Sequence, residues 1–170
     1  MSWSVFKAKC NVLTGNPHVS TELFAQTLSD AYHTCVSMHF DTMTAAGVLI
    51  NNAPNLPILN QQILSICNAN RASGQDVDFL KQIGPFIIQY WSTGLTIVGP
   101  TGTTTVLSPG TWQNVKVPPN QDFQIILNAF MISARTHIMS LVGQYVSSVV
   151  PGVVTPWSGA SFLSLPLFFF

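Results

Sequence analysis

Residues 18–40, HVSTELFAQTLSDAYHTCVSMHF, decide the fold class, because they carry both the start signal and the buried stripe of an amphipathic helix. Ser20 is a good N-cap, and the helix dipole favours a carboxylate such as Glu22 in the first turn. The apolar residues at three- and four-residue spacing are Phe24, Leu28, Ala31, Cys35 and Met38. We therefore expect a helix that runs to about Met43 and buries one face.

Four other segments show the same helical spacing of apolar residues. Residues 3–13 and residues 58–67 each predict a short helix. Residues 76–91 predict an amphipathic helix that the Gly84-Pro85 pair should kink or split. The last helix is expected over residues 122–149, where the apolar side chains again form one stripe.

One segment between these helices has a different character. Residues 95–117, LTIVGPTGTTTVLSPGTWQNVKV, are rich in β-branched residues, with Gly and Pro at turn spacing. This pattern predicts a β-hairpin or a three-stranded meander. The expected fold is mainly α, with a single helical bundle over residues 1–150, a small β insertion at 95–117, and an extended apolar C-terminal arm over residues 151–170.

The composition indicates a surface that other proteins cover. Only 7% of the 170 residues are charged, against roughly 25% in an ordinary soluble domain. Six basic residues balance six acidic ones, so the net charge is zero. A free monomer then has little electrostatic protection against association.

The charge distribution and the cysteines exclude several classes of protein. The basic residues are scattered and form no stripe that could replace counterions on phosphates, so no nucleic-acid partner is expected. No membrane span is expected either, because Arg135 and His137 interrupt the most apolar segment. Cys10, Cys35 and Cys67 are widely spaced and odd in number, which favours reduced core thiols of a protein made in a cytoplasm.

No motif predicts a catalytic, cofactor or metal site. Gly94 and Gly99 have phosphate-loop spacing, but Pro100 follows where that loop needs lysine. Cys35 and His39 could share a helix face, yet no second ligand pair at zinc-like spacing accompanies them. No GxSxG elbow is present. We therefore expect a protein that is not an enzyme, without cofactor, metal or small-molecule substrate.

Two tryptophans outside the expected helices are candidate interface anchors. Trp112 and Trp157 each stand beside Gly, Ser or Thr in a turn-like context. For both residues, contact with another chain and cover of the local core are about equally favoured. For Trp91, within a helix, we expect a core position.

The C-terminal arm is the second candidate interface. Its sequence ends in SFLSLPLFFF, and as an extended strand it is apolar on both faces. The candidate contact residues are Phe162, Leu165, Leu167, Phe168, Phe169 and Phe170. We expect Ala160–Phe170 to dock on an adjacent protein, with packing on its own core as the alternative.

Five short motifs resemble a known group of proteins. They are MSWSVFK, NPHVSTELFAQTLSDAYHTCV, PNLPILNQQI, YWSTGLTI and PWSG, in this order along the chain. Together they resemble short proteins encoded among the structural genes of large contractile-tailed bacteriophages. The chain departs from that pattern at SMHFDTMTAAG, where a charged run and a glycine often follow in the group. The resemblance implies a structural virion part in the tail, neck or baseplate, with no catalytic residues.

The function expected from the sequence is therefore structural. We expect a subunit of a symmetric viral assembly, a tailed-phage virion component whose partners are copies of itself and other virion proteins. The expected location is the virion, after synthesis in the host cytoplasm. The alternative is a small membrane-associated or apolar-ligand protein that uses its Phe-rich C-terminus.

Overall fold

The computed structural model describes residues 3–14, 19–43, 49–50, 55–73, 78–92, 96–99, 102–118 and 123–159. The described helices are α1 (Trp3–Thr14), α2 (Thr21–Met43), α3 (Asn55–Ser73), α4 (Phe79–Ser92) and α5 (Phe123–Met139). The described strands are β1 (Leu49–Ile50), β2 (Thr96–Gly99), β3 (Gly102–Ser108), β4 (Val142–Ser147) and β5 (Val154–Ser158). This mainly helical chain with one small sheet confirms the predicted fold class.

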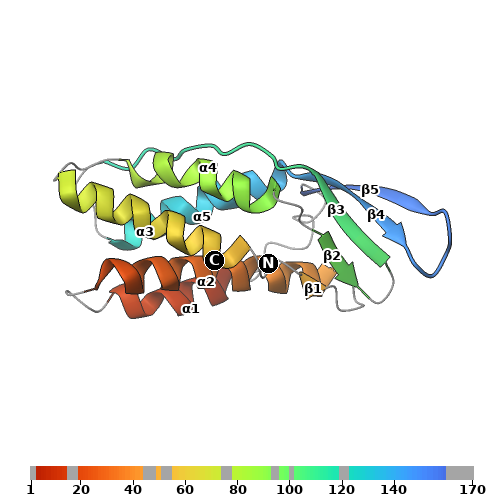
Figure 1. Ribbon diagram of the computed structural model, residues 1–170, viewed down its shortest axis with the longest axis horizontal. Coiled ribbons are helices and arrows are strands. Elements are labelled where there is room, and N and C mark those ends of the chain that lie inside the picture. The colour runs from red at the N-terminus through yellow and green to blue at the C-terminus, as the bar shows by residue number, and fades with distance from the viewer. Residues whose placement is uncertain are drawn as a thin grey trace.

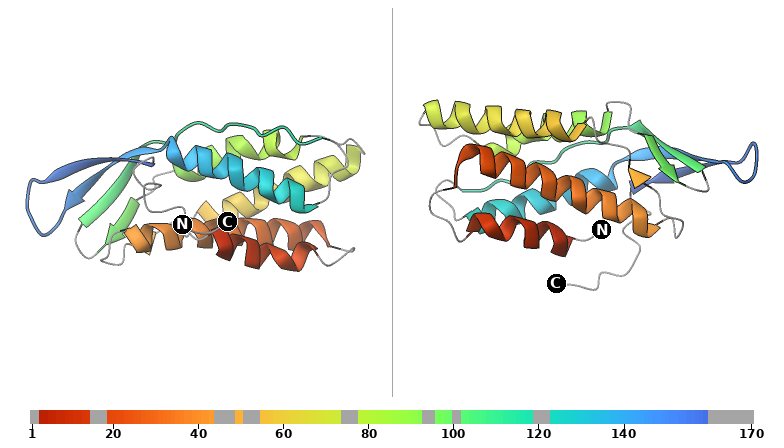
Figure 2. Two further views of the ribbon diagram at one scale, coloured as in Figure 1. Left: turned by 180° about the vertical axis from the view of Figure 1, so that it is seen from behind. Right: turned by 60° about the horizontal axis from the view of Figure 1, so that its bottom comes forward.

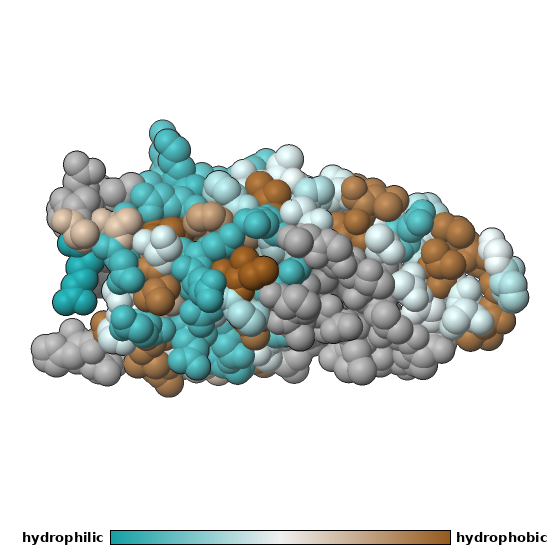
Figure 3. Space-filling view, in the orientation of Figure 1, coloured by the Kyte–Doolittle hydropathy of each residue, from teal (hydrophilic) through white to brown (hydrophobic). Residues whose placement is uncertain are grey.

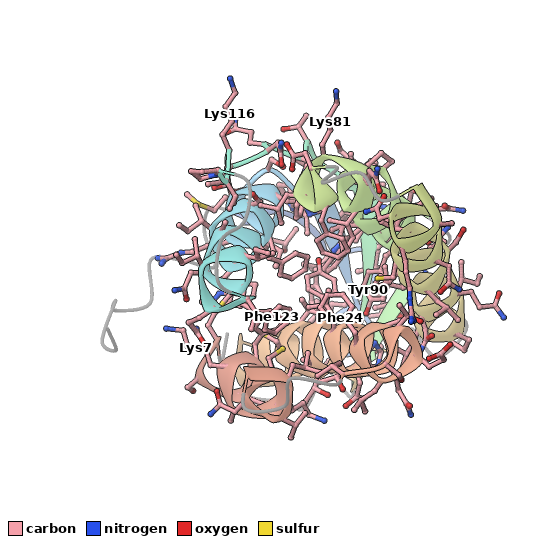
Figure 4. The ribbon with its side chains drawn as sticks, turned by 90° about the vertical axis from the view of Figure 1, so that its left-hand side faces the viewer. Lys7, Phe24, Lys81, Tyr90, Lys116 and Phe123 are labelled. Atoms are coloured by element: carbon pink, nitrogen blue, oxygen red, sulfur yellow. The ribbon has the colours of Figure 1, made fainter. Side chains whose placement is uncertain are left out.

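The helices form one end of an elongated molecule, and the sheet extends from the other end (Figures 1 and 2). All strand pairs are antiparallel, and the strands lie in the order β1-β2-β3-β4-β5. Viewed along the bundle, the helices surround a core into which Phe24, Tyr90 and Phe123 point (Figure 4). Lys7 and Lys81 point outward in the same view.

Helix α2 begins and ends where the sequence predicts. The Leu23 amide donates a hydrogen bond to Ser20 Oγ at 3.1 Å, which is the expected N-cap. Leu28, Ala31 and Cys35 are fully buried on the predicted stripe. The helix ends at Met43.

Replacing Ser20 with alanine should lower the free energy of unfolding by about 1 kcal/mol, because one α2 amide then loses its side-chain acceptor. Ser20→Asn is the matched control, since asparagine caps helices as well as serine does. Urea unfolding followed by circular dichroism measures both variants. Equal losses in the two would contradict a capping role.

Aromatic rings hold the helices together around Phe130 of α5. Its ring stacks on Phe6 of α1 at a centroid distance of 5.5 Å and meets the edge of Tyr32 of α2 at 5.9 Å. All three side chains are essentially inaccessible to solvent. Such ring pairs add about 0.5–1.5 kcal/mol each beyond the area they bury.

Buried hydrogen bonds fix how α2, α3 and α4 pack. Trp91 Nε1 donates to the Tyr32 hydroxyl at 2.7 Å, and the Asn55 amide donates to the Tyr90 carbonyl oxygen at 2.9 Å. Burial raises the pKa of Tyr32 well above its ordinary value. Trp91 is therefore a core residue, as expected.

Helix α4 runs from Phe79 to Ser92 as one continuous helix with Pro85 inside it, so, of the kink or split expected at Gly84-Pro85, the split did not occur. Pro85 is exposed, and Gly84 is buried beneath the indole of Trp112. A Cβ atom at Gly84 would lie only 2.3 Å from Cδ1 of that ring. Gly84 therefore makes room for the indole.

The prediction that the last helix continues to residue 149 is wrong. α5 ends at Met139, and Val142–Ser147 form β4, which pairs with β3 on one side and β5 on the other. Val154–Ser158, assigned to the arm from sequence, form β5. Free backbone groups of β3 give this segment a ladder that an isolated helix end does not offer.

The predicted β insertion is also shorter than expected. β2 and β3 form a hairpin, Thr96 opposite Thr105 and Gly99 opposite Gly102. Residues 109–118 contain no strand. They form an extended segment over the helices, which we call the strap (Figure 1).

Candidate assembly surface

The strands contain none of the twelve formally charged residues. Residues 82–115 and 136–170 have no Asp, Glu, Lys or Arg, and these ranges contain β2, β3, β4 and β5. In Figure 3 the hydrophilic residues gather mostly over the helical end, while aliphatic and weakly polar residues cover the sheet end. Charge is therefore partitioned along the molecule.

The sheet end exposes aliphatic side chains that form one candidate surface. We call it the sheet-end surface, and its members are Leu107, Val142, Val146, Val149, Val150, Val153 and Val154. They account for most of the exposed large apolar side chains in the described residues. Exposed apolar patches of this kind mark protein or membrane contacts.

Strand pairing places several of these side chains on one face. Val142 and Val146 lie four residues apart on β4 and therefore point to the same face, and Val146 lies opposite Val154 of β5. Gln144, between the two valines of β4, lies opposite Pro156. This face is thus uncharged, and three of its side chains are valines.

The β4–β5 turn holds three valines at the tip of the sheet. The Val153 amide donates to the Val150 carbonyl oxygen at 3.3 Å, and Gly152 has a φ of 81°. Proline followed by a left-handed glycine is the preferred centre of a type II turn. Ser147 Oγ accepts bonds from the amides of Val149 and Val150 at 3.2 and 3.0 Å. The tip is therefore an ordered loop.

Strand addition to the outer edge of β5 is disfavoured. Ser147 N donates to Val153 O, and Gly159 N donates to Leu141 O. The backbone N–H and C=O groups of odd-numbered β5 residues therefore point toward β4. The backbone nitrogen of Pro156 therefore points away from β4, and because it carries no hydrogen the outer edge lacks one donor. Proline at this position is a common protection against edge pairing, so the face and tip are the better contact surfaces.

The strap fastens the sheet to the helices, and Trp112 is its main anchor. Trp112 Nε1 donates to the Leu80 carbonyl oxygen at 3.1 Å, and the ring packs 5.9 Å from Phe130. The Thr111 amide donates to Ser140 Oγ at 2.8 Å, and Asn114 donates to Asp78 at 2.7 Å. Trp112 is thus engaged within the molecule, which is the core alternative that the sequence left open.

His137 lies beneath the strap and is fully buried. Its Nε2 lies 2.7 Å from the Pro109 carbonyl oxygen, so Nε2 donates and carries the proton. Nδ1 is buried without a partner among the described residues. Burial lowers the pKa of His137 to about 4, although the bond to Pro109 acts in the opposite direction.

The other predicted interface residues are only partly described. Trp157 lies in β5, where its backbone pairs with Gly143 of β4, but its side chain lies outside the described residues. The remaining predicted contacts, Phe162, Leu165, Leu167, Phe168, Phe169 and Phe170, lie outside the described residues. The exposed valines of β4 and β5 were not predicted from the sequence. Their signal was a long uncharged segment with Pro-Gly flanked by valine pairs.

Features of other classes of site are missing from the described residues. No three His, Cys, Asp or Glu side chains converge within the described ranges as metal ligands could. Burial raises the pKa of Cys10 and Cys35 to about 12, so both thiols stay protonated. None of the helices in the described part of the chain combines the length and apolarity needed to cross a bilayer.

Neither a family model, nor a curated protein, nor a solved structure matches this chain.

Proposed function

We propose that the protein is a structural subunit of a symmetric viral assembly, a tail, neck or baseplate component of a tailed-phage virion. It acts by packing against copies of itself and other virion proteins. The short motifs that resemble structural-gene products of contractile-tailed phages support a role in the virion. The low charge and zero net charge support close packing.

The sheet-end surface is the observation that carries the proposal. It combines exposed valines, an ordered tip and the absence of charged residues from residues 136–159. Interface cores are depleted of charged residues in the same way. A partner that packs there removes these side chains from water, at about 25 cal/mol for each Å² of apolar surface.

Membrane association is the alternative use of the same surface. Peripheral membrane binding draws on Lys and Arg that face anionic lipids. Residues 136–159 contain neither. The observations therefore favour a protein partner.

Introducing a charge at the tip should weaken self-association. Val149→Asp places a carboxylate where an apolar contact is proposed, so we expect association to weaken about tenfold or more. Val12→Asp in α1 is the matched control, because Val12 is 59% exposed and Val149 65%. Sedimentation velocity measures the oligomeric state, and circular dichroism checks that both variants keep their helices.

Two outcomes would contradict this use of the surface. One is equal association of Val149→Asp, Val12→Asp and the unchanged chain. The other is a monomer that floats with phosphatidylcholine–phosphatidylglycerol vesicles and loses this binding in Val149→Asp. The second outcome would favour the membrane alternative.

The virion itself is tested in purified particles. Mass spectrometry should detect the chain in particles purified on a density gradient, and cross-linking should identify its neighbours there. If the chain is present in infected cells but absent from intact particles, the proposed virion role is wrong.

A further inference from the structure

Helix α5 carries an exposed apolar stripe apart from the sheet-end surface. Ile125, Ile132 and Met139 are 42%, 56% and 43% exposed. Their spacing of seven residues places them on one line along the helix. We call this line the α5 stripe. The opposite face of α5 is buried in the core, where Phe130 and Ala134 lie.

The chain that follows β5 starts at one end of the α5 stripe. β5 carries the chain back from the tip toward the helices (Figure 2). The Gly159 amide donates to the Leu141 carbonyl oxygen at 2.7 Å. Leu141 lies two residues beyond the end of α5, and a Cβ atom at Gly159 would lie 3.1 Å from the carbonyl carbon of Met139, so the described chain ends beside Met139.

The length of residues 160–170 fits the α5 stripe. An extended chain of this length spans up to about 36 Å, and the stripe from Met139 to Ile125 is about 21 Å long. The segment ASFLSLPLFFF is apolar and uncharged. α5 itself has Arg135 as its single formally charged residue. Length, starting point and polarity therefore agree.

We propose that residues 160–170 pack along the α5 stripe of the same chain and cover Ile125, Ile132 and Met139. The tether favours this site, because a short connection gives an effective concentration in the millimolar range. The stripe is thus a docking site for the C-terminal segment. The proposal does not depend on the virion role, and its test uses residues outside the sheet-end surface.

Photo-cross-linking in the complete chain tests the contact. The photoreactive residue p-benzoylphenylalanine replaces Ile132, or Val12 as the control of similar exposure. A mixture of isotopically heavy and light chains is irradiated, and the linked peptides are identified by mass spectrometry. We expect links from position 132 to residues 160–170 within chains of one isotope, and no such links from position 12.

Two results would overturn the proposal. Links from position 132 that never reach residues 160–170 would show that the segment docks elsewhere. Links that join heavy and light chains would show that the segment docks on a neighbour, which is the arrangement that the sequence alone favours.

A labelling measurement that does not need the photoreactive residue provides a second test. Ile132→Cys, in a Cys67→Ser background, should react about tenfold faster with maleimide when Phe168, Phe169 and Phe170 are replaced by serine. Val12→Cys should react at one rate in both chains. Equal rates at position 132 would also overturn the proposal.

Discussion

Replacing Trp112 with alanine is expected to lower the free energy of unfolding by about 3 kcal/mol, the lower end of the range for a buried tryptophan because the side chain is only half-buried. The indole fills the space above Gly84 and packs 5.9 Å from Phe130. Its Nε1 also satisfies the Leu80 carbonyl oxygen. The alanine variant leaves a cavity and loosens the strap.

Urea unfolding measures this loss, and two variants serve as controls. Trp112→Phe keeps much of the ring contact but loses the bond to Leu80, so it should fall between alanine and the unchanged chain. Leu107→Ala removes a side chain that is 60% exposed and should have little effect. If Trp112→Ala instead unfolds like the unchanged chain and only assembles more weakly, Trp112 acts chiefly at an interface.

Acidification from pH 7 to pH 4 is expected to remove about 3 kcal/mol of stability through His137 alone. Burial lowers the pKa of His137 to about 4 in the folded chain, while the unfolded chain titrates near its ordinary value of 6.5. Between these values the unfolded chain binds the additional proton. Stability is therefore lost as the pH falls from about 6.5 to 4, and His137 contributes no further loss below that.

The variant His137→Gln separates this effect from the titration of other groups. Glutamine keeps a donor for the Pro109 carbonyl oxygen and cannot be protonated in this range. We expect the loss of stability between pH 7 and pH 4 to be about 3 kcal/mol smaller in the variant. His33, whose pKa burial also lowers, remains in both chains and cancels in the comparison. An identical pH dependence in both chains would mean that His137 is not buried as a neutral group.

Local signals in the sequence were sufficient for the bundle. In α2 the Ser20 cap and the stripe through Leu28 and Cys35 lie within one continuous segment, so the chain needs no distant partner to reveal them. The same holds for α1, whose buried Phe6 and Cys10 follow the predicted spacing. A repeat of 3.6 residues over several turns is a strong signal.

The sheet could not be predicted in full, because its strands depend on distant partners. Leu141 and Tyr145 continue the spacing of α5, and a short apolar segment supports a helix or a strand equally well. β4 forms because β3 offers it a ladder from Gly102 to Ser108. The strap was included in the predicted β segment, but it does not form a strand. Its backbone amides at Val115 and Thr111 donate to the Ser133 and Ser140 side chains instead of to a neighbouring strand.

The features of the candidate surfaces likewise depend partly on the sequence alone and partly on the tertiary structure. The sequence by itself determined the mainly helical fold, the low charge and the uncharged segment after Arg135, because these are properties of composition and local spacing. The tertiary structure alone decided that Trp112 packs inward, that valines of β4 and β5 share an exposed face, and that the α5 stripe ends beside Gly159. Which face of a strand or loop meets water depends on what packs against its other side, and that partner lies far away in the chain.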